Sequence, residues 1–172
     1  MRKEYLTISP NQTKKLGETL AKEILKTQPK KLAQILGLEG DLGGGKTTFL
    51  QGLARGLGIK QKILSPTFIL MRKYQLTTNN KQLTTKNRRL RVVSCKLKSY
   101  FYHIDCYRIK KPKEILDLGF REIISNPKNT VAIEWSDHVR KIIPEDSLII
   151  KFELANKNKR KIVINKKWRN LK

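Results

Sequence analysis

A glycine-rich run in the first third of the chain has the residue types and spacing of a polyphosphate-binding loop. The pattern G-x-x-x-x-G-K-S/T is matched by Gly40-Asp41-Leu42-Gly43-Gly44-Gly45-Lys46-Thr47, and Thr48 follows. In such loops, glycines let successive backbone N–H groups surround the phosphates, the lysine adds its charge at the β- and γ-phosphates, and the hydroxyl binds Mg²⁺. We therefore predict that residues 42–48 bind a nucleoside triphosphate, with Lys46 at the phosphates and Thr47 at the metal.

Two carboxylates stand at the ends of apolar segments, where a metal site beside this loop needs them. Asp105 follows the aromatic segment 99–104, and Glu134 follows the apolar segment 130–133. Parallel strands of an open α/β sheet end at one edge, beside the phosphate loop. Either acid can therefore be the one that serves the metal. Trp135, directly after Glu134, is expected close to the metal.

The remaining hydroxyl and imidazole groups give weaker predictions. Thr67, in Ser65-Pro66-Thr67, lies where a loop that senses the γ-phosphate is expected, although a turn hydroxyl explains it equally well. His103 and His138 are too few and too poorly supported to indicate a metal site or a nucleophilic triad. The sequence contains no Asn-Lys-x-Asp string of the kind that reads guanine, which favours ATP as the nucleotide.

The phosphate loop lies between segments that predict the strand and the helix it requires. Residues 32–38 form an apolar run that is typical of a buried strand. After the loop, apolar residues recur at helical intervals up to Leu57, and Gly58 is placed to end that helix. The N-terminus of this helix also favours a bound anion.

The first residues predict a strand followed by a capped helix. Residues 5–8 favour a short strand, and Ser9 is placed as the N-cap of a helix that runs to about Lys26. Pro10 suits the first helical position, and Gln12 completes a capping box.

Further strands and one helix are predicted downstream. A helix opens at Pro112, carries apolar residues up to Ile124 and is closed by Asn126-Pro127. The predicted strands span residues 68–74, 99–104, 130–133, 147–154 and 160–165, the last two forming a terminal hairpin.

Composition limits the setting in which such a site works. At 172 residues, 38% of them apolar, the chain fits one domain over residues 1–172. No apolar stretch reaches the roughly 18 residues of a membrane span, and no such stretch follows the first residues as in a secretory signal. Cys95 and Cys106 form neither a disulfide framework nor a metal cluster. We expect a reducing, cytoplasmic compartment and no membrane partner.

The charge is strongly positive and unevenly distributed. The formal net charge is +24, and the interval between Asp41 and Asp105 holds thirteen Lys or Arg residues and no acid. Such charge attracts nucleic acid or an acidic protein, although a lysine-rich proteome produces it without a function. Residues 75–98 carry seven basic residues and few large apolar ones, which is typical of an extended hairpin or a disordered insertion. The run 86–91 lacks aromatic residues, so it predicts contact with phosphates and not with bases.

Five motifs together resemble the TsaE (YjeE) family of ATPases in their order and approximate spacing. The motifs are the phosphate loop 40–48, Ser65-Pro66-Thr67-Phe68, Tyr102-His103-Ile104-Asp105-Cys106-Tyr107-Arg108, Asp117-Leu118-Gly119-Phe120 and Ile133-Glu134-Trp135. The resemblance covers the chain apart from residues 75–98. It implies an α/β fold: a small P-loop NTPase-like domain with a mostly parallel central sheet and terminal antiparallel strands.

The resemblance also implies roles for the matching residues. Segment 42–48 would bind ATP, with Lys46 on the β- and γ-phosphates. Thr47 and Glu134 would hold Mg²⁺. Asp105 would be a second essential acid that bears on the metal or on the water.

Two more residues and the partners are implied in the same way. Trp135 would lie beside the nucleotide, and Thr13, in the N-terminal helix, would approach the adenine. The family supports formation of threonylcarbamoyladenosine at the adenosine that follows the anticodon of ANN-decoding tRNAs. It works with a TsaD–TsaB heterodimer, so tRNA is a direct or indirect partner. ATP hydrolysis would reset that complex and would be weak without it.

Two other functions stay open on the sequence alone. One is a P-loop small-molecule kinase whose lid arginines are Arg88, Arg89 and Arg91, although no acceptor site is evident. The other is a basic nucleic-acid-binding module with a vestigial nucleotide site, which the charge favours and the complete set of loop and acids opposes. For residues 75–98 we hypothesise contact with tRNA phosphates or with an acidic face of a partner. The alternative is that the segment is a disordered hairpin that varies within the family.

Overall fold

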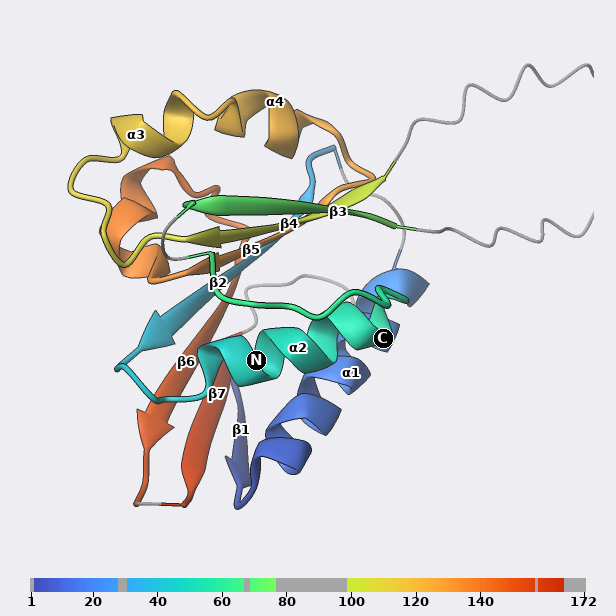
Figure 1. Cartoon of the computed structure of the whole chain (residues 1–172), viewed down its shortest axis with the longest axis vertical. Coiled ribbons are helices and arrows are strands. Elements are labelled where there is room, and N and C mark those ends of the chain that lie inside the picture. Colours follow the sequence, from blue (N-terminus) through green and yellow to red (C-terminus); the bar gives the residue numbers. More distant parts are fainter. Residues whose placement is uncertain (1, 28–30, 67–68, 77–98, 157, 166–172) are drawn as a thin grey trace, which may run out of the picture.

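The structure is a computed structural model that describes residues 2–27, 31–66, 69–76, 99–156 and 158–165. Twelve helices and strands occur within these ranges, and seven of them are strands of one sheet (Figure 1). In chain order they are β1 (Arg2–Thr7), α1 (Pro10–Lys26), β2 (Gln34–Gly40), α2 (Lys46–Gly56), β3 (Met71–Gln75), β4 (Tyr100–Asp105), α3 (Lys113–Leu116), α4 (Phe120–Ser125), β5 (Thr130–Glu134), the 3₁₀ helix η1 (Ser136–Ile142), β6 (Leu148–Leu154) and β7 (Arg160–Asn165).

The sheet is parallel in its centre and antiparallel at its edges. Its strand order is β1-β7-β6-β2-β5-β4-β3. β2 pairs in parallel with β5 and β6, and β5 pairs in parallel with β4. The terminal hairpin β6–β7 and strand β1 complete one edge, whereas β3 runs antiparallel to β4 at the other. The predicted α/β fold with a parallel centre and terminal antiparallel strands is confirmed.

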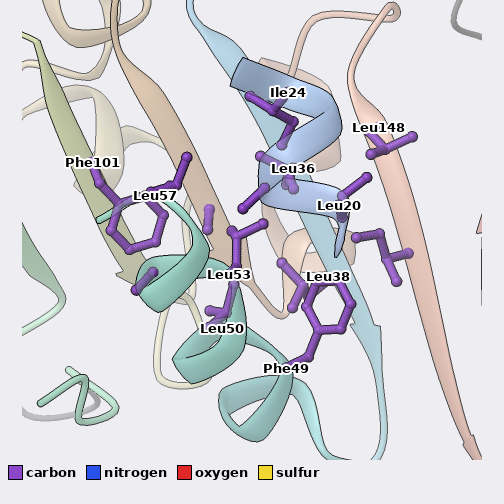
Figure 2. Packing of buried hydrophobic residues seen from close by; sticks show 14 of the residues in the cluster. Leu20, Ile24, Leu36, Leu38, Phe49, Leu50, Leu53, Leu57, Phe101 and Leu148 are labelled. Carbon is purple, nitrogen blue, oxygen red and sulfur yellow. The ribbon is translucent and has the colours of Figure 1, made fainter. Parts of the chain in front are cut away.

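Alternation along β2 supplies both faces of the sheet with a core. Leu36 and Leu38 belong to a cluster with α1 and α2, whereas Ile35 belongs to a second cluster with α3, α4 and η1. Figure 1 shows these two groups of helices on opposite sides of the sheet. Figure 2 shows Leu36 and Leu38 packed among side chains of α1 and α2. The phosphate loop is therefore anchored by a central strand before it and a buried helix after it.

The N-terminal cap has the predicted form with one difference. The Oγ of Ser9 accepts a hydrogen bond from the backbone N–H of Gln12 at 3.3 Å, with Pro10 in the first turn. The side-chain oxygen of Gln12 returns to the N–H of Ile8 at 2.8 Å, not to that of Ser9. Helix α1 begins at Pro10 and ends at Lys26 as predicted.

Two element predictions were wrong in part. The single helix predicted from Pro112 is two short helices, α3 and α4, because the chain turns at Gly119 with a φ of +77°. This left-handed conformation is incompatible with a continuing helix. Strand β3 begins at Met71 and not at residue 68. Residues 67–68 and 77–98, including most of the basic segment 75–98, lie outside the described residues.

None of the helices in the described ranges combines the length and the apolar character that crossing a membrane requires.

Candidate nucleotide-binding site

The phosphate loop joins the end of β2 to the start of α2. Gly45 is the N-cap residue of α2 and has a φ of +99°, a left-handed conformation that glycine adopts without strain. As a glycine, Gly45 offers no side-chain cap to the first amides of α2. Unpaired amides at a helix N-terminus favour a phosphate group. The loop thus has the backbone geometry that its sequence predicts.

The side chain of Lys46 lies over the loop and against Trp135. Its Nζ donates to the carbonyl oxygens of Gly40 at 2.5 Å and Asp41 at 2.8 Å. The same ammonium lies 3.9 Å from the centroid of the Trp135 ring, within the range of a cation–π contact. Burial lowers the pKa of Lys46, and the nearby charges of Glu134 and Asp105 partly oppose that shift.

Trp135 reaches this position through an unusual backbone. Its φ is +58°, in a left-handed region that bulky residues rarely adopt. The conformation turns the chain from β5 into η1 and brings the indole over Lys46. Strain of this kind gathers at functional sites. Trp135 therefore lies beside the phosphate loop, and its place beside a nucleotide or a metal stays a prediction.

The carboxylate of Glu134 connects α2 to the sheet. It accepts the hydroxyl hydrogen of Thr47, whose Oγ1 lies 2.9 Å from Oε1 and 3.0 Å from Oε2. On its other side, Nε2 of His103 lies 2.8 Å from Oε1. Both Glu134 and His103 are buried. The predicted pair of hydroxyl and carboxylate therefore meets, although the two residues are far apart in sequence.

Asp105 lies beside Glu134, and its side chain accepts hydrogen bonds from Ser65 and Tyr107. The two residues are directly paired in the register of β4 and β5. The Oγ of Ser65 donates to Oδ2 of Asp105 at 2.6 Å, and the backbone N–H of Tyr107 donates to Oδ1 at 2.9 Å. These contacts fix the orientation of the acid at the end of its strand.

A cleft of about 340 Å³ runs between the loop and these acids. Its volume is at the lower end of the usual range for small-molecule sites. The residues that line it are Leu42, Gly43, Gly44, Gly45, Lys46, Thr47, Thr48, Ser65, Asp105, Tyr107, Glu134 and Trp135. Among the described residues, the structure therefore brings together all those predicted to bind the nucleotide or the metal except Thr13.

Thr13 lies behind the loop and not in the cleft. Its hydroxyl is 2.8 Å from that of Thr7 and also contacts the carbonyl of Ser9. Its methyl group is near Gly45, since a Cβ added there would lie 3.8 Å from it. Of the weaker predictions, Thr67 lies outside the described residues. The imidazole of His138 bonds to the carbonyl of Cys106.

Ser65 and His103 are site residues for which sequence reasoning assigned no role. In the sequence, Ser65 stands out only as a neighbour of Thr67. Two histidines do not predict a metal cluster, so the sequence predicts no role for His103. Its position two residues before Asp105 was the available signal, because residues i and i+2 of a strand share a face.

The oxygen donors of this cleft fit a magnesium ion shared with a nucleotide. Thr47, Asp105 and Glu134 offer hydroxyl and carboxylate oxygens, which are the ligands of Mg²⁺. No group of three or more His, Cys, Asp or Glu able to hold a metal occurs among the residues that the structure describes. Mg²⁺ usually takes one or two carboxylates and completes its shell with phosphates and water. The residues present therefore fit the ion when phosphates accompany it.

Comparison with known proteins decides the family. Residues 7–162 match the family model described as "Threonylcarbamoyl adenosine biosynthesis protein TsaE". The chain belongs to the TsaE family. TsaE proteins are nucleotide-binding proteins of the P-loop type, in agreement with the loop and cleft described above.

Individual TsaE proteins resemble the chain over most of its length. It is 33% identical over 150 residues to the tRNA threonylcarbamoyladenosine biosynthesis protein TsaE of Rickettsia felis, covering 87% of this chain and 71% of that one. The protein of the same name from Bacillus subtilis is 31% identical over 159 residues, 92% of this chain and 82% of the relative. Among solved structures, the crystal structure of Bacillus subtilis YdiB superposes with a TM-score of 0.65 and 26% identity, covering 95% and 84% of the two chains.

Proposed function

We propose that this TsaE chain is a Mg²⁺-dependent ATPase required for threonylcarbamoyladenosine modification of ANN-decoding tRNA, where it acts on a TsaD–TsaB complex. The names of its relatives support the pathway, and the cleft supports the chemistry. The observation that carries the proposal is the contact between the Thr47 hydroxyl and the Glu134 carboxylate, with Lys46 on the same cleft. This is the arrangement that P-loop NTPases use to hold a metal beside the terminal phosphates.

The loop side of the cleft binds the phosphates. The backbone amides of residues 42–48 surround the triphosphate, and Lys46 contributes its charge at the β- and γ-phosphates. Thr47 and Glu134 would hold Mg²⁺, with the Thr47 hydroxyl hydrogen already directed at the carboxylate. When bound, the ion neutralises charge that develops on the phosphate oxygens.

The acid side of the cleft handles the water. Asp105 has one oxygen engaged by Ser65 and the other by the amide of Tyr107. Asp105 lines the cleft at the end of β4, and a carboxylate is a suitable group to accept a proton from water. We assign Asp105 to orienting the attacking water and accepting its proton, and Glu134 to the metal.

Trp135 and Thr13 are the residues proposed to contact the nucleoside. Trp135 lies along the cleft and offers an aromatic face. Thr13 would approach the adenine only from behind Gly45, as its methyl group lies on that side of the loop.

A phosphate-release assay tests the proposal directly. The full chain is incubated with ATP and Mg²⁺ at fixed salt, alone and with its cognate TsaB and TsaD proteins, and the Lys46→Ala variant is the control. We expect slow release by the chain alone and a severalfold rise with the partners, both abolished in the variant. Release that is equal in wild type and Lys46→Ala, with and without the partners, contradicts the ATPase proposal.

A second assay tests the pathway. Modified nucleosides of an ANN-decoding tRNA are quantified after repeated turnover with the partners, with or without this chain. Product that accumulates equally in both reactions contradicts the proposed requirement.

A further inference from the structure

Among the residues that the structure describes, the side chain of His103 forms a hydrogen bond with one acid of the cleft, Glu134. The imidazole is fully buried in β4, and its Nε2 lies 2.8 Å from Oε1 of Glu134. Its other nitrogen, Nδ1, has no hydrogen-bond partner within the part of the chain that the structure describes. Burying a polar ring is unfavourable unless it is hydrogen-bonded. The favourable interaction at His103 is therefore its bond to Glu134.

The direction of this hydrogen bond follows from the partner. An ionised carboxylate only accepts hydrogen bonds, so Nε2 carries the hydrogen and donates it to Glu134. His103 is thus a hydrogen-bond donor to the Glu134 carboxylate.

The two donors to Glu134 come from different sides. Thr47, on α2, lines the cleft together with Glu134, whereas His103 does not line it. The strand register places His103 opposite Ala132 and Asp105 opposite Glu134, so these four side chains share one face of the sheet. His103 therefore contacts the carboxylate from the buried side and leaves the cleft side to Thr47 and to a ligand.

We propose that His103 is a positioning residue that holds the Glu134 carboxylate in the orientation for Mg²⁺ binding. The inference rests on the proposed function, because it assigns the metal to Glu134. Groups that hydrogen-bond a metal ligand orient it, and their removal typically weakens metal affinity by about 10- to 100-fold. Loss of His103 removes one of the two donors, so the carboxylate is free to turn toward Thr47 alone.

Binding measurements separate this role from simple packing. The full-length chain is titrated by calorimetry with a non-hydrolysable ATP analogue, first in EDTA and then over a range of MgCl₂ concentrations. Wild type is compared with His103→Leu, His103→Asn and His103→Gln. The amide nitrogen of glutamine reaches about as far as Nε2 of histidine, whereas that of asparagine stays closer to the backbone. Thermal unfolding of each variant reports its fold, and the asparagine variant replaces the leucine variant if the latter does not fold.

We expect the MgCl₂ concentration for half-maximal tightening of nucleotide binding to rise about 10- to 100-fold in the leucine and asparagine variants. It should stay within about threefold of wild type in the glutamine variant, and affinity in EDTA should be unchanged in all three. An unchanged magnesium requirement in His103→Leu or His103→Asn overturns the inference. Nucleotide binding that weakens equally with and without Mg²⁺ also overturns it, because that result indicates a packing role alone. A glutamine variant whose magnesium requirement rises as much as that of the leucine variant overturns it as well.

The same data show which proposal has failed. Wild type that binds the analogue with no response to Mg²⁺, or does not bind it, overturns the proposed function and this inference together. A normal magnesium response in wild type that all variants share overturns only the role of His103.

Discussion

The two sides of the nucleotide cleft are built in different ways. The loop side is one continuous stretch, residues 40–48, in which the lysine bonds to carbonyl oxygens of its own loop. The acid side is assembled from β4, β5 and the segment before β3, and its contacts join side chains such as Ser65 to Asp105 and His103 to Glu134. The residues of the loop side therefore come from one local segment, whereas the acid side exists only after the sheet has formed.

This difference predicts separable effects of substitution. Changes on the loop side should weaken nucleotide binding with or without metal, since the phosphates contact the loop directly. Changes on the acid side should affect the metal or the hydrolytic step and leave metal-free binding intact. The predictions below run from the largest expected effect to the smallest.

Replacing the loop lysine should have the largest effect. In Lys46→Ala, ATP hydrolysis with the partners should fall by about 10²- to 10³-fold, because one preorganised charge at the reacting phosphates is lost. Calorimetry in EDTA should also show weaker nucleotide binding. Lys60→Ala is the matched control, because Lys60 is exposed beyond α2 and outside the cleft. Equal activity of the two variants would contradict the role of Lys46.

Neutralising each of the two acids should have a different effect on the protein. Glu134→Gln should lose the tightening of nucleotide binding by Mg²⁺, whereas Asp105→Asn should keep it and lose hydrolysis by about 10²-fold, as expected for loss of a general base. Magnesium-dependent binding and phosphate release are measured on both variants, with the exposed Glu145→Gln as control. If Asp105→Asn also loses the magnesium response, both acids serve the metal and the assignment of Asp105 to water is wrong.

Removing the hydroxyl beside Asp105 should have a smaller effect. Ser65→Ala deletes one hydrogen bond to a charged group, so we expect hydrolysis to fall by about tenfold. The hydrogen bond from the amide of Tyr107 to the acid stays in place. Phosphate release is compared with that of Ser125→Ala, whose hydroxyl bonds to a helix carbonyl outside the cleft. No difference between the two would show that the Tyr107 amide suffices.

The smallest effect on nucleotide binding should come from Thr13→Ala. Its hydroxyl is bonded to Thr7, so the variant should lose about 1 kcal/mol of unfolding free energy and about 2–4 °C in melting temperature. ATP affinity should change by less than about threefold. A larger loss of ATP affinity, with GTP affinity unaffected, would instead support contact with the adenine.

Agreement between sequence and structure depended on how local each signal was. Helix α1 was predicted within its bounds because Ser9 and Pro10 mark its start by short-range chemistry. The prediction of a single helix from Pro112 was wrong. Its apolar spacing continues across Gly119, where the backbone conformation breaks the helix. The roles of Thr67 and of the basic segment 75–98 stay predictions.

The sequence by itself determined the phosphate loop, its flanking strand and helix, and the two strand-end acids. These features depend on glycine conformations, on alternation and on residues adjacent in the chain. Only the tertiary structure decided what surrounds the acids. The parallel register of β4 and β5 sets Asp105 beside Glu134 and brings His103 behind that carboxylate. The loop before β3 brings Ser65 to Asp105. Such contacts form between segments distant in sequence, so spacing along the chain can place residues on one face of a strand but does not determine their partners.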